Sequence, residues 1–245
     1  MNNTDGTILF DKQPRIISFA SVVGKKEAQG PLREGFDRII YDSYVGQDSF
    51  EKGESELMRT AMTIALDKAD LKEQDIGIAF CGDLLNQCVA SSFAVSGSPV
   101  PYAGIYGACS TMALGLILSA ITVEGGAAQR AMCAASSHYC TAERQYRFPL
   151  EYGSQRPPTA QWTVTGSGAC VIEADSGHQA QASDAARDNP ALRIIPNTDM
   201  PYIRAAQIGI INDMGITDQN NMGAAMAPAN VKQEQFSQHY LRYYA

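Results

Sequence analysis

The chain has 245 residues, of which 45% are hydrophobic and 18% are charged, an ordinary composition for a globular protein. Its formal net charge is −7, and no cluster of lysine and arginine forms a basic stripe, which argues against nucleic acid as a partner. Segment 1–15 lacks the apolar core of a secretion signal, and the longest apolar stretch, 112–123, is too short to span a bilayer. We therefore expect an acidic protein with no signal peptide and no transmembrane segment.

The elements expected in chain order alternate between strands and helices. They are a strand at 16–23, a loop at 24–37, an amphipathic helix at 54–69, a strand at 76–81, a helix at 84–95, a strand at 104–108, a helix at 110–123, a strand at 131–136, and a strand or hairpin at 161–174. The first of these helices rests on apolar residues at helical spacing, and the strand after it is apolar on both sides. The alternation predicts a layered α/β fold with a mostly buried sheet.

The character of the chain changes after residue 173. A polar stretch with little apolar periodicity follows, and a new strand is expected at 205–211. A strand that restarts here suits the beginning of a second copy of the first unit. We therefore expect a first segment at 1–175, a polar insertion or linker at 176–204, and the start of a second half at 205–245.

Six cysteines are scattered through apolar or strand-like contexts, without the CxxC pairs of a zinc site or the density of a disulfide scaffold. This usage indicates a reducing compartment, in which most of the thiols are small buried hydrophobic groups. The sequence predicts neither a metal site nor a cofactor. The cysteines are Cys81, Cys88, Cys109, Cys133, Cys140 and Cys170.

The motif GACST places Cys109 between a small-residue turn and an apolar helix. A helix N-terminus favours the thiolate, the nucleophilic form of cysteine, through its unpaired N–H groups and its macrodipole. Strand, sharp turn, cysteine and helix together form an arrangement similar in logic to the nucleophile elbow of hydrolases. On this local pattern alone, an inert buried cysteine has about the same weight as a nucleophile.

Polar and charged residues gather in SSHYCTAERQYRFPLEYG, directly after a predicted buried strand, where ligands commonly meet open α/β sheets. His138 is a candidate base, and Arg144 and Arg147 are candidates for gripping carboxylates through paired hydrogen bonds. The alternative is a surface helix in which Glu143 and Arg147 form an ordinary i,i+4 pair, and spacing alone favours this alternative somewhat.

Another predicted strand end, in CGDLLNQ, is followed by Asp83 and Asn86. Both are candidate site residues, although capping of the next helix is the more common role of an aspartate at such a position. The TGSG run at 165–168 lacks the strand-to-helix context of a phosphate loop, so it indicates a strand with close backbone packing.

Five motifs together resemble the stage V sporulation protein AD family of spore-forming bacteria. They are GACST at the start of a helix, DLLNQ after the preceding strand, the continuous SSHYCTAERQYRFPLEYG, the TVTGSGA strand, and GITDQNNMGAAMAPA. The resemblance covers most of 30–228. It implies a fold similar to that of thiolases and β-ketoacyl synthases, whose subunits contain two successive halves packed in five layers. It also implies binding of dipicolinic acid (pyridine-2,6-dicarboxylic acid) and a part in its movement into the developing spore.

The resemblance also suggests where a ligand lies. Cys109 matches the position of the thiolase nucleophile, and the other residues in family motifs fall around the same cleft. A flat dianion is suited by cationic forks, by N–H donors at a helix terminus, and by an apolar slot for its ring. The expected ligand-binding residues are Asp83, Asn86, Cys109, Ser110, Thr111, His138, Arg144 and Arg147.

Departures from the family pattern bear on catalysis. Thiolases and ketoacyl synthases take their catalytic histidine and its partner from the C-terminal half, whereas this chain resembles a complete first half with a truncated or divergent second half. General acid–base help is worth about 10² to 10⁴ in rate, so a lone thiolate makes a poor condensing enzyme. We therefore expect a non-catalytic binding protein. The alternatives are a condensing or acyl-transferring enzyme that uses Cys109 on acyl-CoA or acyl-carrier thioesters, and a structural subunit with a vestigial pocket.

Partners and location follow from the resemblance alone. It implies other proteins of the stage V sporulation A operon as membrane partners, and a peripheral position at the inner membrane of the forespore or spore, inside the cell. A homodimer is expected by analogy with thiolase-like proteins.

Overall fold

The computed structural model describes residues 2–4, 6–146, 163–174 and 200–208. The chain divides into two compact units, one from Phe10 to Arg204 and the other made of the residues on either side of that range. In the second unit, three short strands form an antiparallel sheet in the order β1-β2-β9. Their bounds are β1 (Asn2–Thr4), β2 (Thr7–Leu9) and β9 (Ala205–Gln207).

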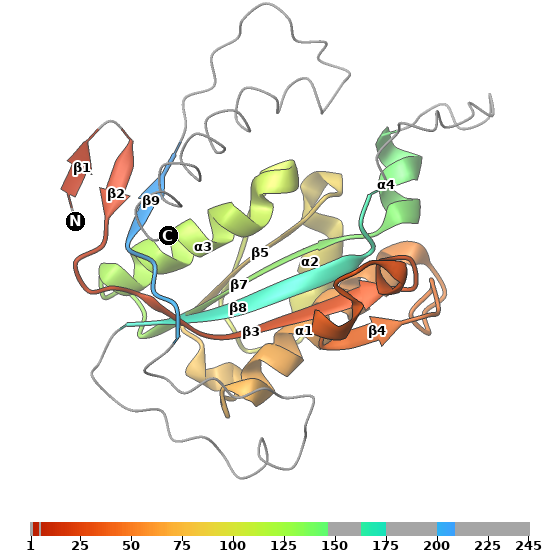
Figure 1. Ribbon diagram of the computed structural model, residues 1–245, viewed down its shortest axis with the longest axis horizontal. Helices are drawn as coiled ribbons and strands as arrows, with labels where there is room; N and C mark the ends of the chain where they lie inside the picture. The colour runs from red at the N-terminus through yellow and green to blue at the C-terminus, as the bar shows by residue number, and fades with distance from the viewer. Residues whose placement is uncertain (1, 5, 147–162, 175–199, 209–245) are drawn as a thin grey trace, which may run out of the picture. The chain divides into compact units, whose positions relative to one another are not determined.

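The unit from Phe10 to Arg204 is built on a six-stranded sheet (Figure 1). In spatial order its strands are β4 (Arg38–Ile40), β3 (Arg15–Gly24), β8 (Gly166–Glu173), β7 (Arg130–Ser137), β5 (Ile78–Asp83) and β6 (Tyr102–Gly104). Among these six strands, β8 alone runs antiparallel to its neighbours, and the others share one direction. The carboxyl ends of the five parallel strands therefore meet at one edge, where ligands commonly bind in α/β proteins.

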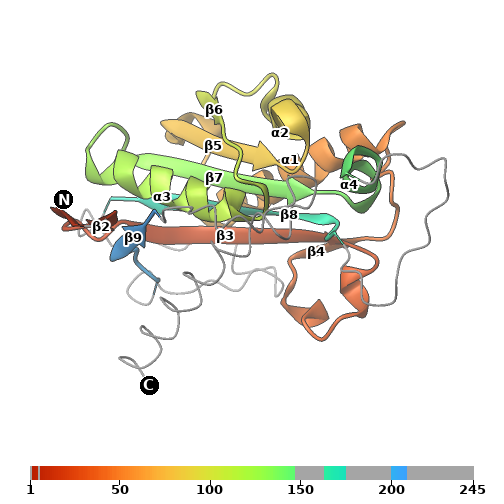
Figure 2. The same cartoon turned by 90° about the horizontal axis from the view of Figure 1, so that it is seen from above.

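Helices cover both faces of this sheet (Figures 1 and 2). Helices α1 (Phe50–Lys68) and α2 (Val89–Val95) pack on one face, and α3 (Thr111–Glu124) packs on the other. Helix α4 (Tyr139–Tyr146) follows β7 at the carboxyl edge. On the α1 face, Leu57 and Met58 are fully buried in one cluster with Val22 and Val171 of the sheet, and burial of this kind is the main source of stability.

The layered α/β fold and the alternation of elements predicted from the sequence are confirmed, with shifts at several boundaries. Helix α1 begins four residues before the predicted position, because the Ser49 hydroxyl caps it by accepting from the Lys52 amide at 3.3 Å. Helix α2 is shorter than predicted, because Gln87 and Cys88 take positive φ angles of 67° and 53° and delay its start.

Other boundaries also moved. The strand expected at 104–108 ends at Gly104, and the strand or hairpin expected at 161–174 is the single strand β8 where it is described. Positions 161–162 and 209–211 lie outside the described residues, as does most of the expected linker. The partition into 1–175, 176–204 and 205–245 stays a prediction.

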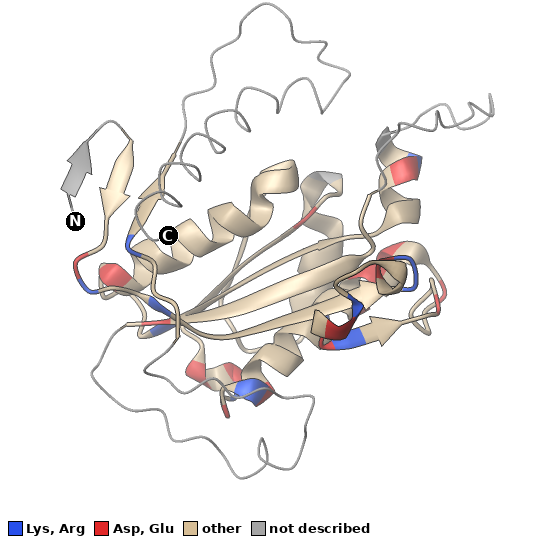
Figure 3. Ribbon diagram, in the orientation of Figure 1, with Lys and Arg blue, Asp and Glu red and all other residues tan. Residues whose placement is uncertain are grey.

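In the coloured ribbon, charged residues mark the helices, the connections and the ends of the central strands, whereas the middle of the sheet is free of them (Figure 3). Arg130 at the start of β7 and Glu173 at the end of β8, for example, form an ion pair at 2.6 Å. The middle of each strand is left to small and apolar residues, which lets helices pack closely on both faces. In the described part of the chain, no helix combines the length and the apolar composition needed to cross a bilayer.

Candidate functional site

The Cys109 turn, residues 107–111, connects β6 to α3 at the carboxyl edge of the sheet. It is a 3₁₀ turn (Ala108–Ser110), and Ala108 takes a positive φ of 47°, which is uncommon for a residue with a side chain. Strand β5 packs closely against this turn at Gly82, where a Cβ would lie 2.6 Å from the Thr111 methyl group, so the position requires glycine. The Cys109 side chain is exposed, and no described residue hydrogen bonds to its thiol. The elbow-like arrangement of strand, turn and helix is therefore present, with an accessible sulfur.

The backbone groups of the Cys109 turn form hydrogen bonds within the turn itself. The Ser110 amide donates to the Gly107 carbonyl at 2.9 Å, and the Thr111 amide donates to the Ala108 carbonyl. The Thr111 hydroxyl accepts from the Gly107 amide and donates to the Ala108 carbonyl. The N–H groups of Ser110 and Thr111, which were expected to be donors for a bound carboxylate, thus already have acceptors in this conformation.

Asp83 ends β5 and is 1% exposed. Its two carboxylate oxygens accept from the amides of Leu85 at 3.0 Å and Ser91 at 2.7 Å, which ties the loop and the first turn of α2 to the strand. Burial raises the pKa of this carboxyl, and the amide donors partly offset that effect. Asp83 therefore plays the helix-capping role that was the alternative for it. Asn86 lies in the 3₁₀ turn between β5 and α2, and its side chain is outside the description.

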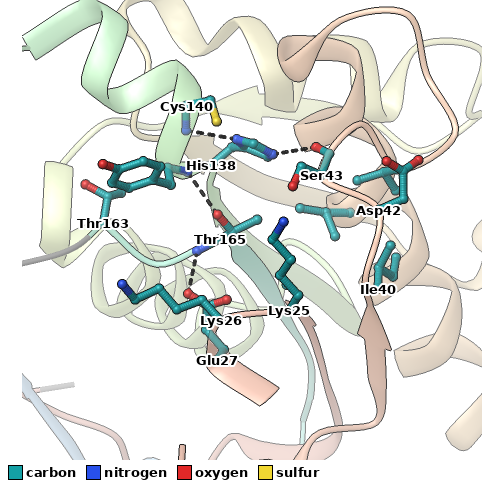
Figure 4. A pocket seen from close by; sticks show the side chains of 14 residues that line it. Lys25, Lys26, Glu27, Ile40, Asp42, Ser43, His138, Cys140, Thr163 and Thr165 are labelled. Carbon is teal, nitrogen blue, oxygen red and sulfur yellow. Dashed lines mark hydrogen bonds between the residues drawn. The ribbon is translucent and has the colours of Figure 1, made fainter. Parts of the chain in front are cut away.

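The His138 corner, residues 136–141, joins β7 to α4; Ser136, His138 and Thr141 are buried, and the other three residues are half-buried. The His138 Nδ1 atom accepts from the Cys140 amide at 3.1 Å, so the ring proton sits on Nε2, which donates to the Ser43 carbonyl at 2.8 Å (Figure 4). Burial lowers the pKa of His138, which keeps the ring neutral at pH 7. With both ring nitrogens bonded to the backbone, His138 has no lone pair left to act as the candidate base.

The arginines fall on or beyond α4. Arg144 is exposed on this helix and forms an ion pair with Glu51 of α1 at 2.8 Å, so its guanidinium already has a carboxylate partner. Arg147 lies outside the described residues, and so does any pair that it forms with Glu143. The structure thus brings Asp83 and His138 to the same sheet edge in structural roles, and leaves Cys109 exposed in the Cys109 turn.

Glu54 is a buried acid that the sequence reading did not single out. It is 0% exposed in α1 and meets the hydroxyls of Ser136 at 3.0 Å and Thr141 at 2.8 Å. The Thr141 hydroxyl also lies 2.9 Å from the His138 carbonyl, and its single proton can serve only one of these two acceptors. If Glu54 is protonated, it donates to Thr141, which then donates to the His138 carbonyl, so that the carboxyl, the hydroxyl and the carbonyl are all hydrogen-bonded. Burial is the largest effect on the pKa of Glu54 and raises it to about 7.

A signal for Glu54 exists in the sequence. It precedes Leu57 and Met58 by three and four residues, so it lies on the apolar face of the helix and not on its solvent face. A lone acid on such a face must be buried or must disturb the packing, which marks it for attention.

A cavity of about 270 Å³ opens beside the His138 corner. Its wall combines the end of β3, the loop after β4, α1, the start of α4 and the approach to β8 (Figure 4). The polar lining groups include two lysines, two acids and several hydroxyls, and apolar side chains complete the wall. The lining residues are Gly24, Lys25, Lys26, Glu27, Ile40, Asp42, Ser43, Val45, Leu57, His138, Tyr139, Cys140, Thr163 and Thr165.

Sequence reasoning pointed to one part of this wall, His138, and missed the residues that come from the predicted loop at 24–37 and from the loop after β4. Among the described residues, no group of three or more histidine, cysteine, aspartate or glutamate side chains is arranged to hold a metal ion. This edge of the sheet offers a cavity and, in the Cys109 turn, an exposed thiol.

Comparisons with known proteins give a consistent picture. A family model described as stage V sporulation protein AD matches residues 4–242. The stage V sporulation protein AD of Bacillus subtilis (strain 168) is 39% identical over 223 residues, which are 91% of this chain and 60% of that protein. The chain thus spans 60% of the length of this curated relative.

Solved structures with a similar backbone include a variant of OleA from Xanthomonas campestris, at 14% identity and a TM-score of 0.47, with 68% of this chain and 60% of that chain covered. They also include 3-oxoacyl-(acyl carrier protein) synthase III, FabH, from Xanthomonas oryzae pv. oryzae, at 16% identity and a TM-score of 0.46, with 68% and 57% covered.

Proposed function

The chain belongs to the stage V sporulation protein AD family, and from that premise we propose that it binds dipicolinic acid without catalysing a reaction, for uptake of this compound into the developing spore. Membership makes the chain a sporulation protein. The ligand, the absence of turnover and the role in uptake are the proposal.

One observation carries the choice of binding over catalysis. The Cys109 thiol is exposed, but the expected base nearby, His138, is neutral and uses both ring nitrogens on backbone groups. A condensing enzyme needs a group that accepts and returns protons at the reacting atoms, and such help contributes about 10² to 10⁴ in rate. Because the hydrogen bonds of His138 occupy the expected base, binding without turnover is the better account.

The carboxyl edge has features that suit a flat dicarboxylate. It contains a cavity that is lined by the His138 ring, by aliphatic side chains such as Leu57, and by lysine side chains. A planar ring is held by apolar contact, and its carboxylates are held by cations and N–H or O–H donors. Arg147 remains a predicted contact on this proposal, and Arg144 would have to release Glu51 to reach a ligand.

Partners and location extend the proposal. We propose that the protein acts at the inner membrane of the forespore or spore, as a peripheral protein, with other products of the stage V sporulation A operon, and as a homodimer. Crosslinking of the full chain in sporulating cells, followed by identification of the crosslinked proteins, tests these partners directly.

A second function is favoured by one observation, the exposed Cys109 in a turn with a positive φ at Ala108. Strain and exposure at a nucleophile are found in acyl-transferring enzymes. In that account Cys109 attacks the carbonyl carbon of an acyl-CoA or acyl-carrier thioester, the acyl group moves to the sulfur, and the thiol of the carrier leaves.

The two functions are separated by one pair of measurements on the purified chain. Calorimetric titration with dipicolinate should give saturable heat, and incubation with acetyl-CoA or malonyl-CoA should leave the intact mass unchanged. An acyl adduct on Cys109 would contradict binding without catalysis, and the absence of heat would remove dipicolinate as the ligand.

The variant Arg147→Ala should weaken binding more than Cys109→Ser, and equal affinity for Arg147→Ala and the wild type would show that Arg147 does not hold a carboxylate.

A further inference from the structure

The cavity beside the His138 corner has the size and wall of a small-molecule site. Its volume of about 270 Å³ falls just below the ~300 to 1,000 Å³ typical of sites for drug-sized ligands, which suits a smaller molecule. Ile40, Val45 and Leu57 supply apolar surface, and the other walls supply hydroxyls and charges. A compact ring with a polar substituent matches this combination.

Lys25 supplies the cation of this cavity. Figure 4 shows its side chain extending into the space between Ser43, Thr165 and His138, whereas the Lys26 side chain points away from that space. Hydrogen bonds from the Gly46 and Tyr44 amides are the main cause of the lowered pKa of Asp42, and the charge of Lys25 adds a smaller lowering. Burial raises the pKa of Cys140, and the charges of Arg144 and Lys25 oppose that rise. Within the part of the chain that the structure describes, no carboxylate forms an ion pair with Lys25.

Two acids that line the same cavity are already engaged by the backbone. One oxygen of Glu27 accepts from the Thr165 amide at 3.1 Å, and its other oxygen is buried without a partner. Asp42 accepts from the amides of Tyr44 at 3.0 Å and Gly46 at 2.8 Å, which fixes it in its own turn. Since these hydrogen bonds hold both carboxylates in place, the Lys25 ammonium remains available to a third one.

Hydroxyl donors lie next to this ammonium. The Thr165 hydroxyl accepts from the Tyr139 amide at 3.0 Å and keeps its own proton to donate, and Ser43 lines the opposite wall. An ammonium with a neighbouring O–H donor recognises a carboxylate through charge-assisted hydrogen bonds, which are about twice as strong as neutral ones.

We infer that this cavity is the site for a carboxylate of a small ring-containing ligand, with Lys25 as the counter-charge and Thr165 as a hydroxyl donor. The inference rests on the proposed function, because it assigns one carboxylate of dipicolinate to this cavity. It differs from the site expected from the sequence, in which Arg144 and Arg147 hold the carboxylates.

The test is calorimetric titration of the full chain with dipicolinate, with picolinate, which keeps one carboxylate, and with pyridine, which has none. The variant Lys25→Gln should bind dipicolinate about tenfold or more weakly than the wild type, because a charge-assisted hydrogen bond is lost. Lys25→Arg should restore most of the affinity. The matched control is Lys72→Gln, which removes an exposed lysine at the amino-end edge of β5, opposite the cavity, and should leave affinity unchanged.

The outcomes separate this inference from the proposed function. If the wild type gives no heat with dipicolinate, both fail. If the wild type binds and Lys25→Gln binds equally well, the proposed function stands and the assignment to this cavity is overturned. Pyridine binding as tightly as picolinate would also overturn the assignment, because the carboxylate would then contribute nothing. Weakening by Lys25→Gln alone, with rescue by Lys25→Arg, supports it.

Discussion

The Cys109 turn and the His138 corner lie at the same edge of one sheet, but they differ in the exposure and the hydrogen bonding of their central side chains. In the Cys109 turn the backbone groups bond to one another, and the thiol is left exposed. In the His138 corner the imidazole itself bonds to the backbone on both sides and is 1% exposed. Cys109 and His138, the candidate nucleophile and the candidate base, therefore differ in availability, because the thiol is exposed and the imidazole is bonded to the backbone.

The largest effect expected from this difference concerns stability. Replacement His138→Ala removes a buried ring and strands the Ser43 carbonyl and the Cys140 amide, so we expect a loss of about 3 kcal/mol in the free energy of unfolding. Urea denaturation measures it. Cys109→Ser is the control from the other region and should change stability by less than about 0.5 kcal/mol. Equal losses in the two variants would remove the distinction between the regions.

The buried acid next to the His138 corner predicts a pH dependence. The folded-state pKa of Glu54, about 7, lies above its ordinary value of 4.5, so the folded chain holds this proton more tightly than the unfolded chain. The contribution is fully present below about pH 4.5 and is lost as the pH rises through 7. Between about pH 5 and pH 8 we expect the wild type to lose on the order of 2 kcal/mol relative to Glu54→Gln.

Parallel unfolding curves at several pH values measure this effect. Glu54→Gln keeps the size and the hydrogen-bonding capacity of the side chain and cannot titrate, so the difference between the two profiles reports the titration of Glu54 together with its electrostatic coupling to Asp83. Identical pH profiles for the two proteins would mean that Glu54 does not titrate in this range.

A smaller difference between the two regions is expected in the reactivity of their thiols. Cys109 is exposed, whereas Cys140 in the His138 corner is half-buried and burial raises the pKa of its thiol. The thiolate is the reactive form, so iodoacetamide should label Cys109 about tenfold faster than Cys140 at pH 7.5 or so. Peptide mass mapping at timed intervals gives both rates from one sample, and faster labelling of Cys140 would reverse the assignment of exposed and protected thiols.

The smallest effect is expected on the surface of α4. Arg144 and Glu51 are 55% and 34% exposed in their side chains, and an ion pair of this kind is worth about 0.5 kcal/mol or less. A double-mutant cycle with Arg144→Gln and Glu51→Gln measures the coupling, which should shrink in high salt. A coupling above about 2 kcal/mol would show that the pair has a structural role comparable to that of His138.

Local pattern was sufficient for the elements of the fold. The apolar spacing around Leu57 and Met58 predicts α1, and the doubly apolar run at 76–81 predicts the buried strand β5. The family resemblance, carried by long motifs, is confirmed by the family match. Both signals are contained in contiguous sequence, which is why they could be read directly.

The roles of the site residues depend on partners far away in the chain. His138 bonds to Ser43, which precedes it by 95 residues, and Glu54 meets Thr141, which follows it by 87. No local pattern shows that such groups converge, so the sequence alone indicates a candidate base at His138. Asp83 was easier, because its acceptor role toward Leu85 and Ser91 is short-range, and helix capping was already the common alternative for it.

The most direct test of binding without catalysis is titration calorimetry of dipicolinate into the wild-type chain and Cys109→Ser side by side. The account predicts saturable binding to both proteins with affinities that agree within about twofold, because the exposed thiol makes no covalent bond to the ligand. Absence of binding to the wild type, or binding that disappears in Cys109→Ser, would contradict it.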